Sequence, residues 1–516
     1  MFWKTLAYTL LAGLATTVVH AQRSYPGCDP LKASDFRITE IFNRNGQNQP
    51  LASESGISEP TNMDLHAVRQ GDSVALVDVY FVERLGKVKR YDAAAKKVQT
   101  LGTIQTLGQV DNGLMGIALH PDYDNNRWIY LWYSPKQMRG QNRLMRLSRF
   151  VVTPQWTLDM GSEKILIEIL GSKSDMYHSG GPMTFDAHGD LWVTVGNNSP
   201  DLDPNTLNVL STTDSTQSAE WGPSNTASLR GGIFRIHPDS STKGYSIPKG
   251  NFGEHWAAVF EAQGKTALAA QYRDPAKVLP EVYVKGSRSN YSLWVHPTKG
   301  WLAWGEVNYD NKFDELNLVT KPVFAGYPYF HADNLPTGAH GKDVNAPKNT
   351  SPFNSGVTEL PPAVPGMINN YPSHNVAITG PIYLFDPSLR SQTKFPPHLH
   401  HAWFSAAWSS SFLFMHTLDT VQMKVTKSER IDNTFLPVKL RRPLQAKFGP
   451  EGALYLLNYD GNYNTINPGV VRIEYSGACQ VPVTALKPEP APEPSFDLTA
   501  GAITVRDAGN HEVALL

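Results

Sequence analysis

One short pattern recurs along this chain and limits the folds that it can adopt. An apolar segment of alternating residues leads into a turn centred on Pro or Gly, and a second apolar segment rich in Trp, Tyr or Leu follows. The clearest copies occupy 117–131, 183–193, 293–304 and 446–456, and weaker ones occupy 79–82 and 402–404. A two-residue period bounded by Gly and Pro predicts half-buried antiparallel hairpins. About six copies of one hairpin unit predict an all-β fold in a radial array, a β-propeller, and the alternative is hairpins from two β-sandwich domains.

The composition agrees with a globular β protein. A length of 516 residues suggests about three domains, but the blades of a propeller share their packing and count as one domain. Hydrophobic residues make up 41% of the chain and charged residues 18%, with 40 Gly and 38 Pro, which indicates a turn-rich globular chain. The net charge of −1 argues against a broad attraction to nucleic acid or to an anionic membrane.

The first 21 residues (1–21) have the features of a signal peptide. Lys4 precedes an apolar run from Leu6 to Val19, and small residues stand directly before Gln22, where cleavage is expected. The run is short and is interrupted by Thr and Gly, so no integral membrane segment is expected after processing. We therefore expect a secreted or periplasmic protein whose propeller spans 22–480.

The two ends of the expected propeller each carry one cysteine, Cys28 and Cys479. Export leads to an oxidising environment, and a propeller brings its ends together in one blade, so we expect a disulfide that closes the ring. The alternative is two buried thiols. Beyond Cys479, residues 481–495 are rich in Pro and Glu and predict a stiff solvated linker. In the short tail at 496–516, apolar and polar residues alternate weakly. This pattern is typical of a strand or of the start of a truncated module.

Polar residues beside the repeated strands are the candidates for function, because ligands of a propeller bind where its loops meet the central channel. Tyr177 and His178 precede Gly180 and Gly181, directly upstream of a predicted strand. The two glycines permit a close approach of the backbone, and an imidazole accepts a proton near physiological pH. The alternative is a turn histidine bonded to a neighbouring carbonyl.

Three further segments carry polar groups near strand ends. Arg288 precedes a strand and offers a bidentate fork for a carboxylate, and the alternative is a surface ion pair. The loop from Gly305 to Asp310, followed by acidic residues at 314–315, is rich in the oxygen ligands that suit Ca²⁺, and the alternative is a solvated acidic loop. Arg442 places another cation at a strand entrance.

The order of the motifs resembles that of the glucose/sorbosone dehydrogenase family, the soluble pyrroloquinoline quinone (PQQ)-dependent sugar dehydrogenases. The resemblance runs from about Leu65 to Tyr475 and implies a six-bladed β-propeller. The segments that carry it lie at 111–123, 178–181, 229–236, 280–283, 314–317, 326–329 and 448–455.

The resemblance also implies a reaction. A base takes the proton of the C1 hydroxyl of an aldose while hydride passes from C1 to the quinone, and Ca²⁺ polarises the quinone carbonyl. His178 stands where the family has its base. Asp111 stands where the family has an acid or amide that faces the cofactor and the sugar. Asn197 and Tyr177 are the expected substrate contacts.

Cofactor and metal residues follow from the same resemblance. Arg288 and Arg442 match arginines that hold the cofactor, and Asn290 is the expected amide contact to it. The backbone carbonyls of Asn308 and Tyr309 match the loop that ligates Ca²⁺.

The chain departs from the family pattern at several of these positions. The asparagine that usually follows the cofactor-binding arginine is either displaced to Asn290 or lost, and Asn197 replaces a common Asp. No cation stands at 408–411, and Leu444 occupies the position of an Arg in some members. Because PQQ carries three carboxylates, each lost charged hydrogen bond removes about 1.5–3 kcal/mol of binding free energy.

From these features we expect an exported quinoprotein dehydrogenase with PQQ and Ca²⁺ as cofactors. It would oxidise an aldose or a related saccharide at C1 and pass electrons to a soluble or membrane-bound acceptor. A degenerate propeller that binds glycans without redox chemistry is the alternative, and a hydrolase or lyase on the same scaffold is a third possibility.

Overall fold

The structure of the protein is a computed structural model. It describes residues 30–43, 56–173, 177–199, 215, 218–308, 313–337, 343–372, 375–461 and 467–479, together with the backbone of short strands at 496–497, 504–506 and 512–513.

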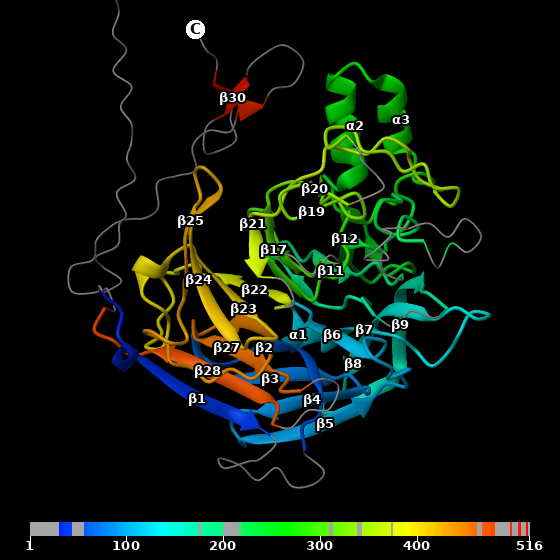
Figure 1. Ribbon diagram of the computed structural model, residues 1–516. Coiled ribbons are helices and arrows are strands. Elements are labelled where there is room, and N and C mark those ends of the chain that lie inside the picture. Colours follow the sequence, from blue (N-terminus) through cyan, green and yellow to red (C-terminus); the bar gives the residue numbers. More distant parts are fainter. Residues whose placement is uncertain are drawn as a thin grey trace, which may run out of the picture.

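The described chain forms six β-sheets arranged around a central axis (Figure 1). Each sheet is built on four antiparallel strands, and we number these blades in chain order. Blade 1 holds β2 (Pro60–Gln70), β3 (Ser73–Glu83), β4 (Lys87–Asp92) and β5 (Lys97–Thr103). Blade 2 holds β6 (Leu114–Leu119), β7 (Trp128–Tyr133), β8 (Leu144–Val152) and β9 (Leu158–Leu170). Blade 3 holds β10 (Met183–Phe185), β11 (Leu191–Val195), β12 (Gly232–Pro238) and β14 (Val282–Lys285).

The second half of the ring repeats this order. Blade 4 holds β15 (Ser292–Val295), β16 (Leu302–Glu306), β17 (Phe313–Val319) and β21 (Ile368–Pro372). Blade 5 holds β22 (Ala377–Ile382), β23 (Ala402–Ala407), β24 (Phe412–Asp419) and β25 (Lys424–Arg430). Blade 6 holds β26 (Pro443–Phe448), β27 (Leu454–Asn458), β28 (Gly469–Tyr475) and, from the start of the chain, β1 (Phe36–Asn43). The expected six-bladed β-propeller is confirmed.

The ring closes through pairing of the two ends of the propeller. β1 runs antiparallel to β28, with Phe36 opposite Tyr475 and Asn43 opposite Gly469, and the two strands lie side by side in Figure 1. The innermost strands of successive blades contact one another, and β26 of the last blade contacts β2 of the first.

The repeated hairpins mark the inner part of the blades. The clear copies form the first and second strands of blades 2, 3, 4 and 6, and the weaker copies lie on the second strands of blades 1 and 5. Every second strand carries a large aromatic residue with a relative exposure below 2%. These residues are Tyr80, Trp132, Trp192, Trp304, Trp403 and Tyr455. The alternation of apolar and polar residues therefore places one large aromatic ring per blade between the sheets. Burial of such a side chain contributes strongly to the stability of the fold.

Insertions extend blades 3 and 4. Between β13 (Tyr245–Ser246) and β14, helices α2 (Phe252–Ala262) and α3 (Thr266–Arg273) stand above the ring in Figure 1. Phe252, Trp256 and Phe260 follow the helical period along α2 and are buried against α3. The remaining short elements are α1 (Tyr123–Asn126), β18 (Val323–Phe324), β19 (Phe330–His331), β20 (Leu335–Pro336) and 3₁₀-helices at 33–35 and 397–399.

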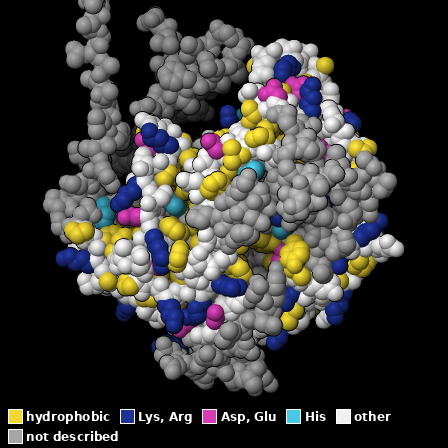
Figure 2. Space-filling view, viewed as in Figure 1, with side chains coloured by type: hydrophobic (Ala, Val, Ile, Leu, Met, Phe, Trp, Pro, Cys, Tyr) yellow, Lys and Arg dark blue, Asp and Glu magenta, His cyan; other side chains and the backbone are white. Residues whose placement is uncertain are grey.

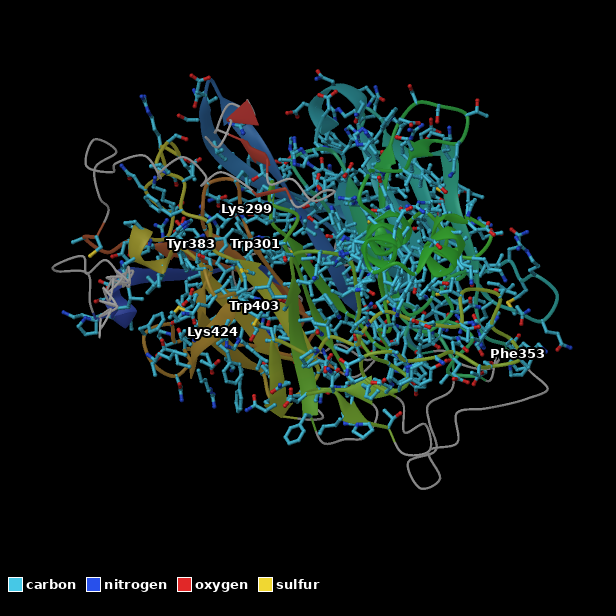
Figure 3. All side chains as sticks on the ribbon, turned by 90° about the horizontal axis from the view of Figure 1, so that it is seen from above. Lys299, Trp301, Phe353, Tyr383, Trp403 and Lys424 are labelled. Carbon is cyan, nitrogen blue, oxygen red and sulfur yellow. The ribbon has the colours of Figure 1, made fainter. Side chains whose placement is uncertain are left out.

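Two further views show how side chains are distributed. Figure 2 shows Lys and Arg scattered over the visible face with Asp and Glu among them, in keeping with the balanced charge. Figure 3 places Trp301 and Trp403, of the neighbouring blades 4 and 5, on one side of the molecule and Phe353 near the opposite edge.

The terminal segments leave several sequence predictions untested. The expected signal peptide, the 481–495 linker and Cys28 lie outside the described residues. Cys479 is buried, with its backbone N–H donating to the Tyr475 hydroxyl at 3.2 Å, and its bridge to Cys28 stays a prediction. In the tail, β29 (Phe496–Asp497), β30 (Thr504–Arg506) and β31 (Glu512–Val513) form a small sheet. Within the described parts, no helix has the length and apolar character needed to span a bilayer.

Candidate functional site

A cavity of about 240 Å³ lies where the inner strands begin, and every blade contributes to its wall. The lining side chains come from β2, β6 and β26, from the segments that enter β6, β10, β15 and β22, and from the residues that follow β3, β16, β23 and β27. They include Thr61, Arg84, Asp111, Met115, Tyr177, His178, Ser289, Tyr291, Val307, Val376, Trp408, Leu444 and Tyr459. The cavity therefore lies on the axis of the ring, where residues distant in sequence converge.

His178 enters this cavity on a backbone that requires glycine beside it. Its own φ is +56°, and those of Gly180 and Gly181 are +72° and +129°. A Cβ on Gly180 would come within 2.5 Å of the carbonyl oxygen of Thr194, and one on Gly181 within 2.6 Å of Cβ of Met115. The two glycines therefore allow β10 to pack tightly while the imidazole faces the cavity.

The hydrogen bonds of His178 define which ring nitrogen is basic. Its Nδ1 lies 2.8 Å from Oδ1 of Asn197. An amide oxygen only accepts, so Nδ1 carries the proton and Nε2 holds the lone pair. The backbone N–H of His178 donates to Oδ2 of Asp111 at 2.9 Å and to the Tyr291 hydroxyl at 3.2 Å. The residue is therefore held both at its main chain and at its ring.

Asp111 and Tyr291 join two walls of the cavity. The Tyr291 hydroxyl donates to Oδ2 of Asp111, the same oxygen that accepts from His178. Asp111 is buried, with a relative exposure of 6%. The structure thus brings Asp111 and His178 together.

Asn197 is fully buried and is held by two arginines. Its backbone N–H donates to the carbonyl of Arg288 at 2.8 Å, and its carbonyl accepts from Nε of Arg230 at 3.0 Å. Its Nδ2 donates to Oγ of Ser199 at 3.2 Å. Arg288 is thereby linked to His178 through a single residue.

Lys285 supports the same region and was not singled out from the sequence. Its Nζ donates to the carbonyls of Gly222, Ser228 and Arg230 at 2.7, 2.9 and 2.6 Å. Burial, with Arg230 nearby, lowers the pKa of Lys285 well below its usual range. Its place at the end of β14, just before Arg288, was the only sequence signal for this role.

The turn that carries Arg288 folds around a buried carboxylate. Glu306 accepts from Oγ of Ser287 and from the backbone N–H groups of Arg288 and Ser289, each at 2.5 Å. Burial raises the pKa of Glu306. Nη1 of Arg288 donates to the carbonyl of Val307 at 2.7 Å. Arg288 does not itself line the cavity. Its sequence neighbour Ser289 and its hydrogen-bond partner Val307 do.

Asn290 points away from the expected contact. Its Nδ2 donates to the carbonyl of Gly232 at 3.1 Å and to Oγ of Ser287 at 2.9 Å. Asn290 is not among the cavity-lining residues, and its neighbour Ser289 is. A cofactor contact through Asn290 stays a prediction, and the structure adds Ser289 as a candidate.

Arg442 reaches the cavity through an aromatic ring. Its guanidinium lies 4.5 Å from the ring centroid of Trp408, and its Nη1 donates to the carbonyl of Gly461 at 2.9 Å. Trp408 and Leu444 line the cavity on this side.

The expected Ca²⁺ loop is described only in part. The backbone N–H of Asn308 donates to Asp314 at 3.2 Å and its Nδ2 donates to the carbonyl of Phe313 at 2.9 Å, and Tyr309 lies outside the described residues. Burial raises the pKa of Asp314 to about 7, and burial together with Glu306 raises that of Glu315 to about 8. Within the described ranges, no group of three or more His, Cys, Asp or Glu side chains has a metal-binding arrangement. The ligands that the resemblance implies are backbone carbonyls, which are oxygen ligands of the kind Ca²⁺ takes, and this site stays a prediction.

Tyr177 lies at the mouth of the cavity. Its side chain is half exposed, and its ring centroid is 6.1 Å from that of His178. A molecule entering the cavity toward His178 would therefore pass this ring, and a substrate contact through Tyr177 stays a prediction.

Comparison with known proteins gives a family match over part of the chain and a shared fold. Residues 74–251 match the family model described as glucose/sorbosone dehydrogenase. An uncharacterized protein (slr1608) of Synechocystis sp. is 26% identical over 263 residues, which cover 49% of this chain and 54% of the relative. Quinoprotein glucose dehydrogenase B of Acinetobacter calcoaceticus is 24% identical over 261 residues, which cover 48% of each chain. The chain thus spans about half the length of the curated relatives it matches.

Solved structures share the fold at low identity. The apo-form of soluble aldose sugar dehydrogenase from Escherichia coli aligns with a TM-score of 0.55 and 16% identity, over 85% of this chain and 99% of that one. The PQQ-bound form of aldose sugar dehydrogenase from Streptomyces coelicolor aligns with a TM-score of 0.51 and 15% identity, over 85% and 98%. The family match and the shared propeller fold confirm the resemblance of this chain to the glucose/sorbosone dehydrogenases.

Proposed function

We propose that this protein is an exported sugar dehydrogenase that oxidises an aldose or a related saccharide at C1 with PQQ and Ca²⁺. The observation that carries the proposal is the hydrogen bond between His178 Nδ1 and Asn197 Oδ1, made at the wall of an axial cavity. The quinoprotein and PQQ-bound relatives support the cofactor by their names.

The cavity has groups that suit a quinone. Ser289 Oγ and Trp408 Nε1 are buried donors for which the described residues provide no hydrogen-bond partner, and both residues line the cavity. Arg288 and Arg442 do not line the cavity themselves. Each contacts a residue that does, Arg288 through Val307 and Arg442 through Trp408. The carbonyls of Asn308 and Tyr309 would hold Ca²⁺. When bound, PQQ supplies a two-electron acceptor and Ca²⁺ a Lewis acid.

The protein side of the reaction follows from the tautomer of His178. With its proton on Nδ1, His178 receives the hydroxyl proton of the sugar on Nε2, and the amide oxygen of Asn197 keeps the ring oriented. A positioned base of this kind contributes about 10²–10⁴ to the rate. Asp111 and Tyr291 hold the main chain of His178, so the ring keeps its place during the transfer.

The test is an assay of the purified protein with PQQ, Ca²⁺ and a panel of aldoses, with reduction of an artificial dye as the signal. We expect sugar-dependent reduction that falls at least about 100-fold in His178→Gln. His188→Gln, which alters an exposed histidine at the turn between β10 and β11, is the matched control and should keep full activity. Absence of PQQ binding would contradict the dehydrogenase proposal.

A glycan-binding propeller without redox chemistry is the second candidate. One observation favours it: among the described residues of the cavity wall, Arg84 is the sole cation, and it is paired with Glu59 at 2.7 Å. Binding of oligosaccharides to the protein without PQQ, combined with no dye reduction, would support this candidate.

A further inference from the structure

Arg230 is buried close to the site, and its guanidinium binds two consecutive backbone carbonyls. Its relative exposure is 1%. Nε donates to the carbonyl of Asn197 at 3.0 Å, and Nη2 donates to the carbonyls of Asn197 and Asn198, each at 2.5 Å. The planar fork of an arginine holds its donors at fixed angles, which the single ammonium of a lysine cannot reproduce. Arg230 therefore fixes the orientation of these two peptide groups relative to each other.

The two asparagines that Arg230 binds both reach back to the segment that carries His178. Oδ1 of Asn197 lies 2.8 Å from Nδ1 of the imidazole. Nδ2 of Asn198 donates to the carbonyl of Tyr177, the residue before His178, at 2.9 Å. The turn that Arg230 fixes thus holds both the ring of His178 and the peptide group that precedes it.

The backbone on both sides of this contact has an uncommon conformation. His178 and Asn198 have φ values of +56° and +44°, in the left-handed region that residues with a side chain seldom adopt. Such conformations persist only where the surrounding contacts determine them. Because Arg230 binds the carbonyl of Asn198 directly, it is one of the contacts that hold this conformation.

Arg230 is itself held from two sides. Its guanidinium carbon lies 3.9 Å from the ring centroid of Trp221. Nζ of Lys285 donates to the carbonyl of Arg230 at 2.6 Å and to that of Gly222 at 2.7 Å. Lys285 thus joins the segment that carries the ring to the segment that carries the guanidinium. Support of this kind behind a functional side chain keeps its geometry precise.

We propose that Arg230 is a positioning residue for His178, which acts through Asn197 and Asn198 to keep the proton of the imidazole on Nδ1 and the lone pair on Nε2. The inference rests on the proposed role of His178 as a base. It concerns the protein alone and does not depend on which ligand the cavity binds.

The experiment is nitrogen NMR of the histidine side chains in the full chain at alkaline pH, without cofactor or sugar. The signals of His178 are assigned by their loss in His178→Gln. In the unaltered protein we expect one tautomer, with Nδ1 protonated. In Arg230→Gln and Arg230→Lys, which lack the fork, we expect signals of both tautomers.

Arg235→Gln is the matched control. Arg235 lies five residues further along the chain and also donates to a backbone carbonyl, that of Lys249 in the segment before α2. This variant should keep the single tautomer of His178. If replacement of the buried Arg230 prevents folding, Trp221→Leu gives the test in a milder form, because the ring that it removes is partly exposed. It too should show both tautomers.

A double variant separates positioning from a merely structural role. If Arg230 acts through Asn197, then adding Arg230→Gln to Asn197→Ala should change the His178 signals no further, although it should still lower the melting temperature. A folded Arg230→Gln protein that keeps the single Nδ1-protonated tautomer would overturn the inference, whatever its activity. Absence of dye reduction in a protein with the expected NMR signals would contradict the proposed function and leave this inference standing.

Discussion

Oδ1 of Asn197 lies 2.8 Å from Nδ1 of His178, and this bond joins the loop after β11 to the segment before β10. Among the described residues, the partner of Nδ1 is thus a neutral amide. A neutral acceptor fixes the tautomer and stabilises the imidazolium less than a carboxylate would.

Asn197→Asp should therefore change the pH dependence of catalysis. A carboxylate at this position favours the imidazolium and raises the pKa of His178, so Nε2 becomes available as a base only at higher pH. We expect the acidic limb of the kcat/KM profile to move upward by about one pH unit. The profile is measured with the best aldose substrate between pH 5 and pH 9. An unchanged acidic limb would show that Asn197 does not control the basicity of His178.

Glu306→Gln should loosen the turn that carries Arg288. The glutamine keeps one acceptor oxygen for the N–H groups of Arg288 and Ser289, and its amide NH₂ then faces Oγ of Ser287 and the indole N–H of Trp304, which loses its acceptor. Leaving buried donors unpaired costs about 1–3 kcal/mol of unfolding free energy, which urea denaturation would measure. Glu359→Gln, at an exposed ion pair with Lys265, is the control and should cost less than about 1 kcal/mol. Equal losses in the two variants would contradict the role given to Glu306.

Phe36→Ala should destabilise the closure of the ring. Phe36 packs against Phe395, Phe435 and Tyr475 with centroid distances of 5.4, 5.9 and 5.5 Å. Truncation of a buried Phe costs about 3–5 kcal/mol, and we expect a corresponding loss in urea or thermal unfolding. Leu76→Ala, at a side chain with 40% exposure, should be close to neutral. A small effect of Phe36→Ala would mean that β1 contributes little to the closed ring.

His416 should make the fold sensitive to acid. It is buried between Oγ of Ser405 and Oγ of Ser428, at 2.7 and 2.8 Å, and burial lowers its pKa to about 3. The unfolded chain takes up a proton near pH 6.5, whereas the folded chain does not, so this stability is present above pH 6.5 and is lost as the pH falls toward 3. At pH 5 the loss is about 2 kcal/mol.

The check is urea unfolding of the unaltered protein and of His416→Gln at pH 7 and pH 5. The variant should lose less unfolding free energy between the two pH values, because glutamine does not titrate. If both proteins lose the same amount, His416 is not a source of the acid sensitivity.

Much of the fold was predictable because its signal is local. In a strand with one buried face, apolar and polar residues alternate along the sequence. The hairpins at 117–131 and 183–193 can therefore be predicted without knowing which strands lie beside them. Helices α2 and α3 were not predicted, because attention to a two-residue period does not detect an insertion with a helical period.

The candidate site was predictable where a residue carries its own signal. His178 stands beside two glycines, and Arg288 stands at a strand entrance. The roles of Ser289 and Lys285 depend on which groups surround each side chain, and that is decided by packing between segments distant in the sequence. Periodicity holds no information about such contacts, so only the three-dimensional structure reveals them.

The pairing of β1 with β28 has a consequence for synthesis. Arg37 and Glu474, which meet across this pair, are 437 residues apart in the sequence. The ribosome makes β1 long before β28, so the nascent chain carries a strand without its partner for most of the synthesis of the propeller. The ring therefore closes only after the last blade has been made, and the edge of β1 stays open to other strands until then.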